Sequence, residues 1–562
     1  MIIFSLYMMI AMLMIGGVAF DLMRYENLRT RIQATTDAAT LAAANLNNSQ
    51  DPEFVVNDYF EKAFGHNATG STFLQDIKVN STSTSRTVSA RADANVRTTF
   101  MQWSGVDELK MTTLGTARQD VGEIEIAMVL DVSGSMVGNR ETNMRTAAKK
   151  FVDTVYPEPL APVDERPTVS FIPYNDQVNL GSTFGPFFNI TQDHTYSWCA
   201  RLPEDEYETL EWDNDVTLER IAHYDRVTNS SNASSEYESL NNLPTPQCPI
   251  DETNAILMHE HDPAKMITYI DDIVADYWSW TAISMGAKFG LAMLDPSSKE
   301  LVTDMVNGDT SRDLAPVLSS RASGLPKNYS TNAGVPNTKI MVLMTDGANT
   351  RQFDAKDGSS SGEPDLKTGN SPVYFSQQLL DDIGSGDMSE AYSVDLTAYG
   401  YSGWWYYSGG VDHDNNSSTP EQVYLFGQNP IEFLGYGDAT VLSNPALFAR
   451  HPAAYIGAEI FGGTSPGYWN YSYSSRGTHY SNAAEVYNSY GDLDDQTEAL
   501  CDAAKAKGIV IYAVAFEAPD AGEELMQHCA NPAENYFNVT GTEVVVAFEA
   551  IARNINQLKL TQ

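Results

Sequence analysis

The sequence predicts an α/β protein whose main domain is a doubly wound, mostly parallel sheet, preceded by a transmembrane helix and a small helix-plus-β module. Three observations support this prediction. Apolar strand patterns such as residues 124–130 and 339–344 alternate with helical segments, which requires crossover connections and therefore a parallel sheet. The chain opens on twenty uncharged residues, and residues 75–118 alternate apolar with polar side chains. With 562 residues, the chain exceeds the usual size of one domain, ~50–250 residues.

The first element is the uncharged segment Met1–Phe20. Twenty residues at a rise of ~1.5 Å span a hydrocarbon core of ~30 Å, so the segment fits a membrane-crossing helix. It lacks the basic start and the small-residue cleavage site of a signal peptide, which favours a retained anchor. Arg24, Arg29 and Arg31 follow the span and favour a cytoplasmic flank, whereas the cysteines and the acidic bulk favour the opposite side. We expect the bulk of the chain outside the cytoplasm.

A helix-plus-β module is expected over residues 21–118. Residues 21–46 lack Gly and Pro and are rich in Ala toward their end, which predicts one continuous helix. Small or apolar side chains recur along it at helical spacing: Leu28, Ile32, Thr35, Ala39 and Ala42. This stripe fits either lateral packing between subunits or a plain stalk. Residues 75–118 then predict a small antiparallel sheet, with turn residues between its strands.

The main domain is expected over residues 120–562. Its predicted strands are 124–130, 167–172, 339–344 and 509–514, and its predicted helices are 142–155, 282–294, 493–507 and 542–558. Pro296 and Gly508 end two of these helices. Two insertions, at about residues 185–265 and 351–490, interrupt the order, and the second is rich in Gly, Ser, Asn and Tyr.

The composition restricts the classes of function and the cellular compartments that are compatible with this sequence. Asp and Glu total 74 against 34 Lys and Arg, a formal net charge of −40, which repels phosphate backbones and excludes broad binding of nucleic acid. Four cysteines allow three pairings. They fall as two couples close in sequence, which predicts the disulfides Cys199–Cys248 and Cys501–Cys529 in an oxidising compartment. Four reduced thiols in the cytosol are the alternative.

Three distant segments carry oxygen-bearing side chains at strand ends or helix starts. Asp131, Ser133 and Ser135 follow the first strand of the main domain. Thr281 opens its second helix, and Asp346 follows its third strand. Ligands of open α/β sheets bind where strand ends meet helix starts. Two carboxylates and three hydroxyls suit Mg²⁺, or another divalent cation such as Mn²⁺ or Ca²⁺, and leave it charge to accept an acidic ligand. Helix capping and turn chemistry are the alternative explanation.

These five residues resemble the metal-ion-dependent adhesion site of the von Willebrand factor type A domain, which has a Rossmann-like fold. The resemblance implies that the two serines and the threonine coordinate the cation directly or through water. It also implies that the two aspartates coordinate the cation or orient waters. The sequence departs from the family at one point, because Trp278 and Trp280 stand where the family usually has a Gly-rich turn before the threonine.

Residues 16–26 and 31–44 are similar to the TadE/TadG-like family of the Tad (tight adherence, Flp-type) pilus system, and so are residues 527–537. The resemblance implies a non-enzymatic pilus-assembly or minor pilin-like protein that mediates adhesion or protein–protein interaction through the metal site. It would cross the bacterial inner membrane once and carry a pilin-like module at 21–118. Its bulk would lie in the periplasm or cell envelope, or at the surface. Its partners would be other Tad pilus or envelope proteins, bound through an acidic group.

Other metal motifs are weaker. His259-Glu260-His261-Asp262 offers zinc ligands, but histidines two apart do not share a helix face and no third His or Cys is near, so we expect a solvated loop. Residues 412–416 begin like a calcium loop, yet Ser417 and Val423 occupy the positions of its Gly and Glu.

The rival function is a secreted glycan receptor or a hydrolase with its activity in residues 351–490. Their Tyr and Trp side chains could face a glycan or could fill a small core of the insertion itself. Ser133 and Ser135 have no sequence-evident His partner, which disfavours a nucleophilic hydrolase at the main domain.

Overall fold

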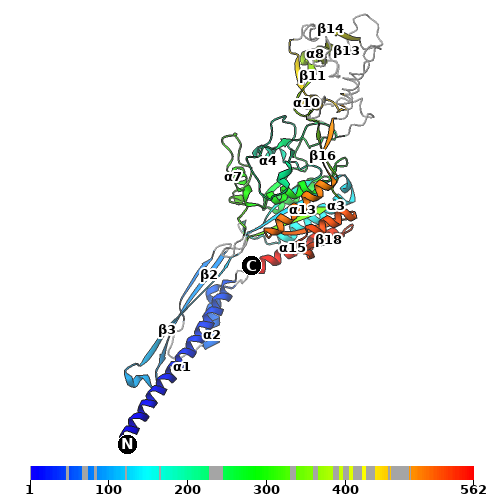
Figure 1. Ribbon diagram of the computed structural model, residues 1–562. Coiled ribbons are helices and arrows are strands. Elements are labelled where there is room, and N and C mark those ends of the chain that lie inside the picture. Colours follow the sequence, from blue (N-terminus) through cyan, green and yellow to red (C-terminus); the bar gives the residue numbers. More distant parts are fainter. Residues whose placement is uncertain are drawn as a thin grey trace.

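The computed structural model is elongated, with the N-terminal helix at one end, the main α/β domain in the middle and part of the second insertion at the other end (Figure 1). The residues that the structure describes are 2–45, 50–65, 74–81, 85–120, 123–163, 166–226, 243, 245–329, 337–358, 365–383, 392–395, 404–408, 421–425, 437–453, 456, 480 and 483–561. The module at the N-terminal end and the second insertion each contain a hydrophobic cluster separate from the two clusters of the main sheet.

Helix α1 (Ile2–Ala44) is the long helix that the sequence predicts. Its first half exposes nearly every large apolar side chain: Ile3, Phe4, Leu6, Tyr7, Met8, Met9, Ile10, Met12, Leu13, Met14 and Ile15. Within the described part of the chain it is the one helix long and apolar enough to cross a membrane. Removing such a surface from water is favourable by ~25 cal/mol per Å², so this half of the helix is better suited to an apolar environment than to water.

The second half of α1 packs on a small sheet of the same chain. Its buried face consists of Ile32, Thr36, Ala39, Thr40, Ala43 and Ala44. Thr36, and not the predicted Thr35, faces the sheet, which follows from the 3.6-residue period of the helix. A Cβ placed on Gly115 would lie 2.8 Å from Thr36 Cγ2, so small side chains allow the strand to approach closely. The predicted stripe is therefore occupied by an intramolecular contact.

The sheet of the module is antiparallel, as predicted, with the order β1-β2-β3. Its strands are β1 (Leu74–Ser81), β2 (Ser85–Arg97) and β3 (Glu108–Asp120). Strands β2 and β3 pair continuously, from Ser85 opposite Asp120 to Arg97 opposite Glu108. Helix α2 (Pro52–Phe64) was not predicted; the Asp51 carboxylate caps it by accepting the Glu53 N–H at 2.9 Å.

The main domain is built on a six-stranded sheet with the order β18-β17-β9-β4-β5-β8. Its strands are β4 (Ile124–Asp131), β5 (Thr168–Tyr174), β8 (Leu257–Glu260), β9 (Thr338–Thr345), β17 (Val510–Phe516) and β18 (Tyr536–Val539). Pairing is parallel from β18 to β5, and only β8 at the edge is antiparallel. The predicted α/β class and its mostly parallel sheet are confirmed.

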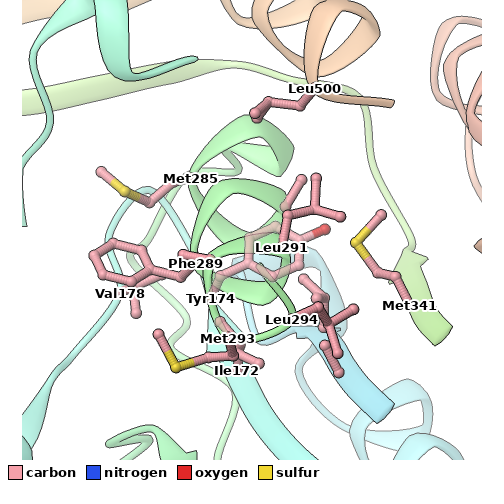
Figure 2. Close-up of a cluster of buried hydrophobic side chains, with 14 of the residues drawn as sticks. Ile172, Tyr174, Val178, Met285, Phe289, Leu291, Met293, Leu294, Met341 and Leu500 are labelled. Carbon is pink, nitrogen blue, oxygen red and sulfur yellow. The ribbon is translucent and has the colours of Figure 1, made fainter. Parts of the chain in front are cut away.

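Helices cover both faces of this sheet, so its central strands are apolar on both sides. One face carries α6 (Ile283–Ala292), α13 (Tyr490–Ala506) and α14 (Asp520–Cys529), and the other carries α3 (Asn139–Val155), α5 (Pro263–Asp272) and α15 (Glu543–Thr561). Figure 2 shows the first of these two cores, in which Tyr174 and Met341 of the sheet lie near Leu291 and Leu500.

Helix α6 approaches the sheet closely because two of its residues are glycines one turn apart. A Cβ on Gly286 would lie 2.5 Å from a ring carbon of Tyr174, and one on Gly290 would lie 2.5 Å from Val129 Cγ2. Thr281 lies just before this helix, so the close packing of α6 on the sheet fixes the position of Thr281 relative to the end of β4.

The two insertions pack differently. The first adds the strands β6 (Ala200–Arg201) and β7 (Glu219–Arg220) and sends apolar side chains, Phe188 and Trp212 among them, into the core below α6. The second begins and ends with the paired strands β10 (Arg351–Ala355) and β16 (Ala484–Ser489).

Beyond that pair, the second insertion forms a sheet with the order β14-β13-β12-β11-β15. Its elements are β11 (Asn370–Phe375), α8 (Gln377–Ile383), β12 (Tyr392–Asp395), β13 (Trp404–Ser408), β14 (Glu421–Leu425), β15 (Thr440–Ser443) and α10 (Asn444–Phe448). Phe375, Tyr392 and Tyr480 are buried in its own core. For these three residues the burial fits the small-core interpretation, and the glycan surface stays a prediction for the other Tyr and Trp side chains of the insertion.

Candidate metal centre

The three predicted segments converge at the carboxyl edge of the main sheet. Strands β4 and β9 are parallel neighbours, with Leu130 paired to Met344. Asp131 therefore ends one strand beside the end of the other, and Asp346 follows one residue later. The strand order reverses here, because the chain continues from β4 to β5 on one side while β9 lies on the other. Such a reversal leaves space at the edge for a ligand.

Four of the five predicted residues form one hydrogen-bonded cluster. Asp131 accepts the Ser133 N–H at 2.8 Å on Oδ1 and the Thr345 hydroxyl at 2.7 Å on Oδ2. The Ser135 hydroxyl donates to Asp346 Oδ1 at 2.6 Å and lies 3.2 Å from the Ser133 hydroxyl. Thr345 was not among the predicted residues, although its hydroxyl holds the Asp131 carboxylate in place.

Thr281 reaches the same cluster from the side of α6. A Cβ placed on Gly347 would lie 3.5 Å from Thr281 Oγ1 and 3.9 Å from Ser135 Oγ, so both hydroxyls border the same backbone segment. The Thr281 N–H donates to Thr350 Oγ1 at 2.8 Å, and its carbonyl accepts the Thr350 N–H at 2.9 Å. The fifth predicted residue is thus fastened to the chain that follows β9.

The two carboxylates are buried beside each other. Asp131 is fully buried and Asp346 is 3% exposed. Burial and the neighbouring charge of Asp346 raise the pKa of Asp131 to about 7, and burial raises the pKa of Asp346. Adjacent desolvated carboxylates favour a proton or a cation between them, so the cluster is electrostatically suited to bind positive charge.

One cation of the chain itself lies at the cluster, and the sequence analysis missed it. Arg140, in the first turn of α3, donates from Nη1 to Asp346 Oδ2 at 2.8 Å and from Nε to Glu517 Oε2 at 2.9 Å. The guanidinium neutralises the outer oxygen of Asp346 while Oδ1 of the same carboxylate faces Ser135. No motif spacing marks this arginine, because its partner lies 206 residues away.

The donor set fits a hard divalent cation. Carboxylate and hydroxyl oxygens are the ligands that Mg²⁺ prefers, whereas zinc sites use nitrogen and sulfur. In the described ranges, no group of three or more His, Cys, Asp or Glu side chains could hold a metal ion. The oxygens that would hold a cation here are those of Asp131, Ser133, Ser135, Thr281 and Asp346.

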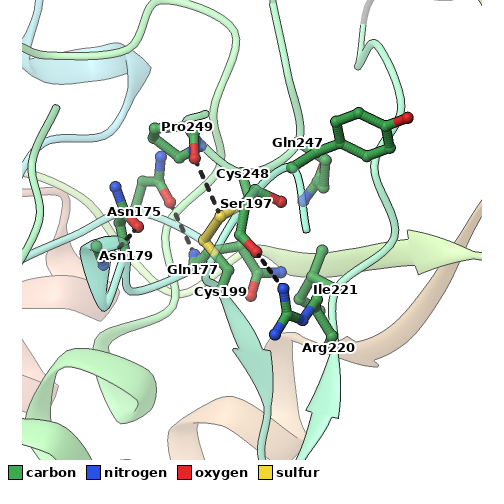
Figure 3. Close-up of a disulfide and its surroundings, with 12 residues drawn as sticks. Asn175, Gln177, Asn179, Ser197, Cys199, Arg220, Ile221, Gln247, Cys248 and Pro249 are labelled. Carbon is green, nitrogen blue, oxygen red and sulfur yellow. Dashed lines mark hydrogen bonds between the residues drawn. A yellow bond between two sulfur atoms is a disulfide. The ribbon is translucent and has the colours of Figure 1, made fainter. Parts of the chain in front are cut away.

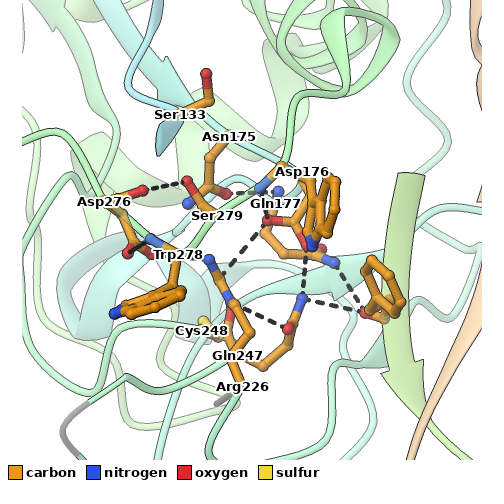
Figure 4. A network of polar contacts seen from close by, with 12 residues as sticks. Ser133, Asn175, Asp176, Gln177, Arg226, Gln247, Cys248, Asp276, Trp278 and Ser279 are labelled. Atoms are coloured by element: carbon orange, nitrogen blue, oxygen red, sulfur yellow. Dashed lines mark hydrogen bonds and ion pairs between the residues drawn. The ribbon is translucent and has the colours of Figure 1, made fainter. Parts of the chain in front are cut away.

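A buried polar network ties the loop before Thr281 to the first insertion (Figure 4). Arg226 donates to Asp276 Oδ2 at 2.8 Å, and its other terminal nitrogen lies 3.6 Å from Asp176 Oδ1. The Gln247 amide donates to Asp176 Oδ2 at 2.7 Å. Gln247 directly precedes Cys248, so the disulfide of Cys248 restrains the segment that positions this loop (Figure 3).

Exposed aromatic side chains border the cluster on that loop. Tyr277, Trp278 and Trp280 are all exposed. Gly134 packs under them, since its N–H lies 3.4 Å from the Ser279 carbonyl oxygen and a Cβ there would lie 2.5 Å from the Tyr277 carbonyl oxygen. The tryptophans that replace a Gly-rich turn therefore form a rim beside the candidate centre.

Both predicted disulfides are confirmed. Cys199 bonds to Cys248 and Cys501 bonds to Cys529, which leaves no free cysteine. The second bond joins α13 to α14 on one face of the sheet. Two disulfides are typical of an oxidising compartment and argue against the alternative of cytosolic thiols.

The prediction of a solvated loop at the His259 motif is wrong. His259 lies in β8, where it is 3% exposed, and burial lowers its pKa to about 3. The segment is buried because β8 pairs with β5 at Val169 opposite Glu260. Asp262 caps α5 by accepting the Ala264 N–H. Residues 412–416, which begin like a calcium loop but lack its Gly and Glu, lie outside the described residues.

Comparison with known proteins bears on the N-terminus most directly. Residues 1–46 match the Tad family, described as Flp pilus-assembly TadE/G-like. The N-terminal segment is TadE/G-like. This match confirms the resemblance noted for residues 16–26 and 31–44, and the similarity noted for residues 527–537 stays a prediction. No curated protein matches the sequence.

Among solved structures, the chain is similar to pilus proteins at low identity. The vWF domain of the type V pili tip protein Mfa5 from Porphyromonas gingivalis shares 13% identity at a TM-score of 0.30, over 78% of this chain and 97% of that one. The pilus adhesin SpaC from Lactobacillus rhamnosus GG shares 12% at 0.28, over 88% and 35%. The pilus adhesin RrgA from Streptococcus pneumoniae shares 12% at 0.28, over 86% and 49%. Because these scores are low, the fold class rests on the strand order described above.

Proposed function

We propose that this chain is a non-enzymatic envelope protein of a Tad pilus system that binds an acidic group on a partner through a divalent cation. The TadE/G-like segment supports the pilus system, and the exposed apolar half of α1 supports an anchor in the bacterial inner membrane. The disulfides support a periplasmic or envelope-exposed bulk. Other Tad pilus or envelope proteins are the proposed partners.

The observation that carries the proposal is the meeting of two buried carboxylates with three hydroxyls at the reversal point of the sheet. The hydroxyls are neutral and the two carboxylates formally match a divalent ion, but Arg140 pairs with Asp346 at 2.8 Å and shares its charge, which leaves the ion part of its positive charge. When bound, Mg²⁺ would supply a positive charge that pairs with a carboxylate of the partner. Thr345 and the Ser133 N–H keep Asp131 oriented, and Ser135 does the same for Asp346.

The test is calorimetric titration of Mg²⁺ into the full chain in detergent, first with the parent and then with Ser135→Ala. We expect the parent to bind the ion and the variant to bind it roughly ten-fold more weakly, since one oxygen ligand and one support of Asp346 are lost. Thr281→Ala should weaken binding similarly.

Asp153→Ala is the matched control, because it removes an exposed carboxylate from α3 away from the cluster. It should bind Mg²⁺ as the parent does. If the parent takes up no Mg²⁺, Mn²⁺ or Ca²⁺, or if Ser135→Ala and Thr281→Ala bind like the parent, the metal function is wrong.

A further inference from the structure

The tip of the β2–β3 hairpin is docked on the part of α1 that lies within the uncharged span. Phe100 packs against Gly17 so tightly that a Cβ on this glycine would lie 2.4 Å from the Phe100 ring. The Phe100 and Phe20 rings meet edge to face, with centroids 6.1 Å apart. The tip continues as the 3-10 turn η1 (Met101–Ser104). This arrangement can be followed in Figure 1, where the hairpin runs down beside α1.

Asp21 fixes this docking by binding the backbone of the tip. Its carboxylate accepts the N–H groups of Thr99 at 3.0 Å, Phe100 at 2.8 Å and Met101 at 2.9 Å. Arg24, one turn later, donates to the Thr99 hydroxyl at 3.1 Å. These four hydrogen bonds therefore hold the tip at one height along the helix.

That height lies at the boundary of the apolar span. Residues 2–20 carry no charge, and at a rise of ~1.5 Å per residue Gly17 lies ~6 Å below Asp21 along the axis. A helix whose uncharged segment fills a hydrocarbon core of ~30 Å has Gly17 and Phe20 at the edge of that core. A tip that contacts both residues lies at the same depth.

The composition of the tip suits that depth. Residues 98–106 contain no charged side chain, and they are bounded by Arg97 on one side and by Asp107 and Glu108 on the other. Trp103 is 73% exposed and stacks edge-on against Phe100 with centroids 6.0 Å apart. An exposed tryptophan beside a membrane span is typical of the interface between lipid headgroups and acyl chains.

We propose that the β2–β3 tip is a second membrane contact, with Trp103 inserted in the headgroup region on the side of the bilayer that carries the main domain. The proposal rests on α1 crossing the bilayer, and the lipid surface is the one occupant it names. Docking by Asp21 holds the hairpin parallel to α1, so the two contacts together fix the tilt of the stalk.

The test places a fluorescent NBD label at Ser104→Cys in the full chain, which is reconstituted in vesicles of phosphatidylethanolamine and phosphatidylglycerol. All four native cysteines are in disulfides, so the new thiol is labelled alone. Lipids with a doxyl quencher near the headgroup should quench roughly half of the emission at this position. Replacing Trp103 by Ser in the same background should clearly reduce that quenching.

Two further labels separate the possible failures. Leu114→Cys lies on an exposed position of β3, near Thr36 and ~28 Å further along α1 than Gly17, and should not be quenched. Leu13→Cys, probed with a doxyl group deep in the acyl chains instead, reports on the span itself. If Leu13→Cys is quenched and Ser104→Cys is not, the tip proposal is wrong and the anchor stands; if neither is quenched, the anchor is wrong as well. A blue-shifted label at Ser104→Cys without lipid quenching would indicate burial by protein, and this too overturns the proposal.

Discussion

Arg140 is the residue on which the charge balance of the candidate centre depends. Its guanidinium is one third exposed and forms ion pairs with Asp346 and Glu517, whereas the nearby Asp131 is fully buried. The arginine and a divalent cation would both act on Asp346, so removing the arginine should make the site more dependent on added metal.

Arg140→Gln should destabilise the metal-free protein by about 1–2 kcal/mol, because the buried Asp346 loses its ion-pair partner. The loss is smaller than for a fully buried ion pair, since Arg140 is partly exposed and solvent screens its charge. Added Mg²⁺ should then raise the melting temperature of the variant more than that of the parent. Arg553→Gln, which breaks an exposed pair with Glu549, is the control and should change stability by less than about 0.5 kcal/mol. Equal responses of Arg140→Gln and parent to Mg²⁺ would contradict the prediction.

Buried histidines predict a loss of stability in mild acid. Burial lowers the pKa of His223 to about 3, and neither ring nitrogen has a hydrogen-bond partner among the described residues. The native state holds this ring neutral while the unfolded state protonates it near its usual pKa of ~6.5. Its contribution is therefore complete above that pH and falls as the pH drops toward 3, by at most about 1.4 kcal/mol per unit.

His223→Phe keeps a ring against Tyr196, with which His223 stacks at 4.5 Å between centroids. Denaturant unfolding at about pH 7.5 and about pH 5 should show a smaller loss for the variant than for the parent. An equal acid-induced loss of stability in both proteins would show that the fold does not lower the pKa of His223, and it would contradict the prediction.

Motif spacing could predict that five oxygen-bearing side chains meet at one edge of the sheet, because each stands directly at a strand end or helix start. Sequence alone could not identify Thr345 as the hydroxyl that holds Asp131, nor Arg140 as the cation beside Asp346, because these contacts exist only after distant segments converge. The same reason explains the error at His259, whose burial depends on a short edge strand.

At the scale of elements, the strongly periodic segments were predictable and the short ones were not. The apolar strands β4, β9 and β17 and the helices around them lie within a few residues of their predicted bounds. The edge strands β8 and β18 were missed because each has four residues and a mixed polarity. Helix α2 was missed although Asp51-Pro52 is an N-cap followed by proline in the first turn.

Replacing glycine by alanine should have opposite effects on stability in α6 and in α13. Gly286→Ala should destabilise the fold by about 1–3 kcal/mol, because the new Cβ would overlap Tyr174 and Val129 and push α6 from the sheet. Gly491→Ala in α13 meets nothing within 4 Å and should be neutral or stabilise by up to about 1 kcal/mol. Chemical denaturation of both variants checks this, and a stabilised Gly286→Ala would show that α6 packs less closely.

At the scale of the molecule, the two disulfides should contribute similarly to stability but differ in their effect on Mg²⁺ binding. They close loops of 49 and 28 residues, and because the loop-closure entropy grows only slowly with length, removing either pair by Cys→Ser should cost a similar ~2–4 kcal/mol of unfolding free energy. Only Cys199–Cys248 adjoins the network that holds the loop before Thr281. Loss of this bond should also weaken Mg²⁺ binding by calorimetry, whereas loss of Cys501–Cys529 should not. Equal effects on binding would mean that the first insertion does not position the loop.

The direction of β3 has a mechanical consequence. This strand begins at the hairpin tip that is docked on α1 and ends at Asp120, four residues before β4 enters the main sheet at Ile124. Tension between an attached partner and the bilayer would pull β3 lengthwise past β2, which loads all of their paired residues together in shear instead of peeling them apart in sequence. The hairpin is thus oriented to resist force along the axis on which a tethered adhesive protein would be pulled.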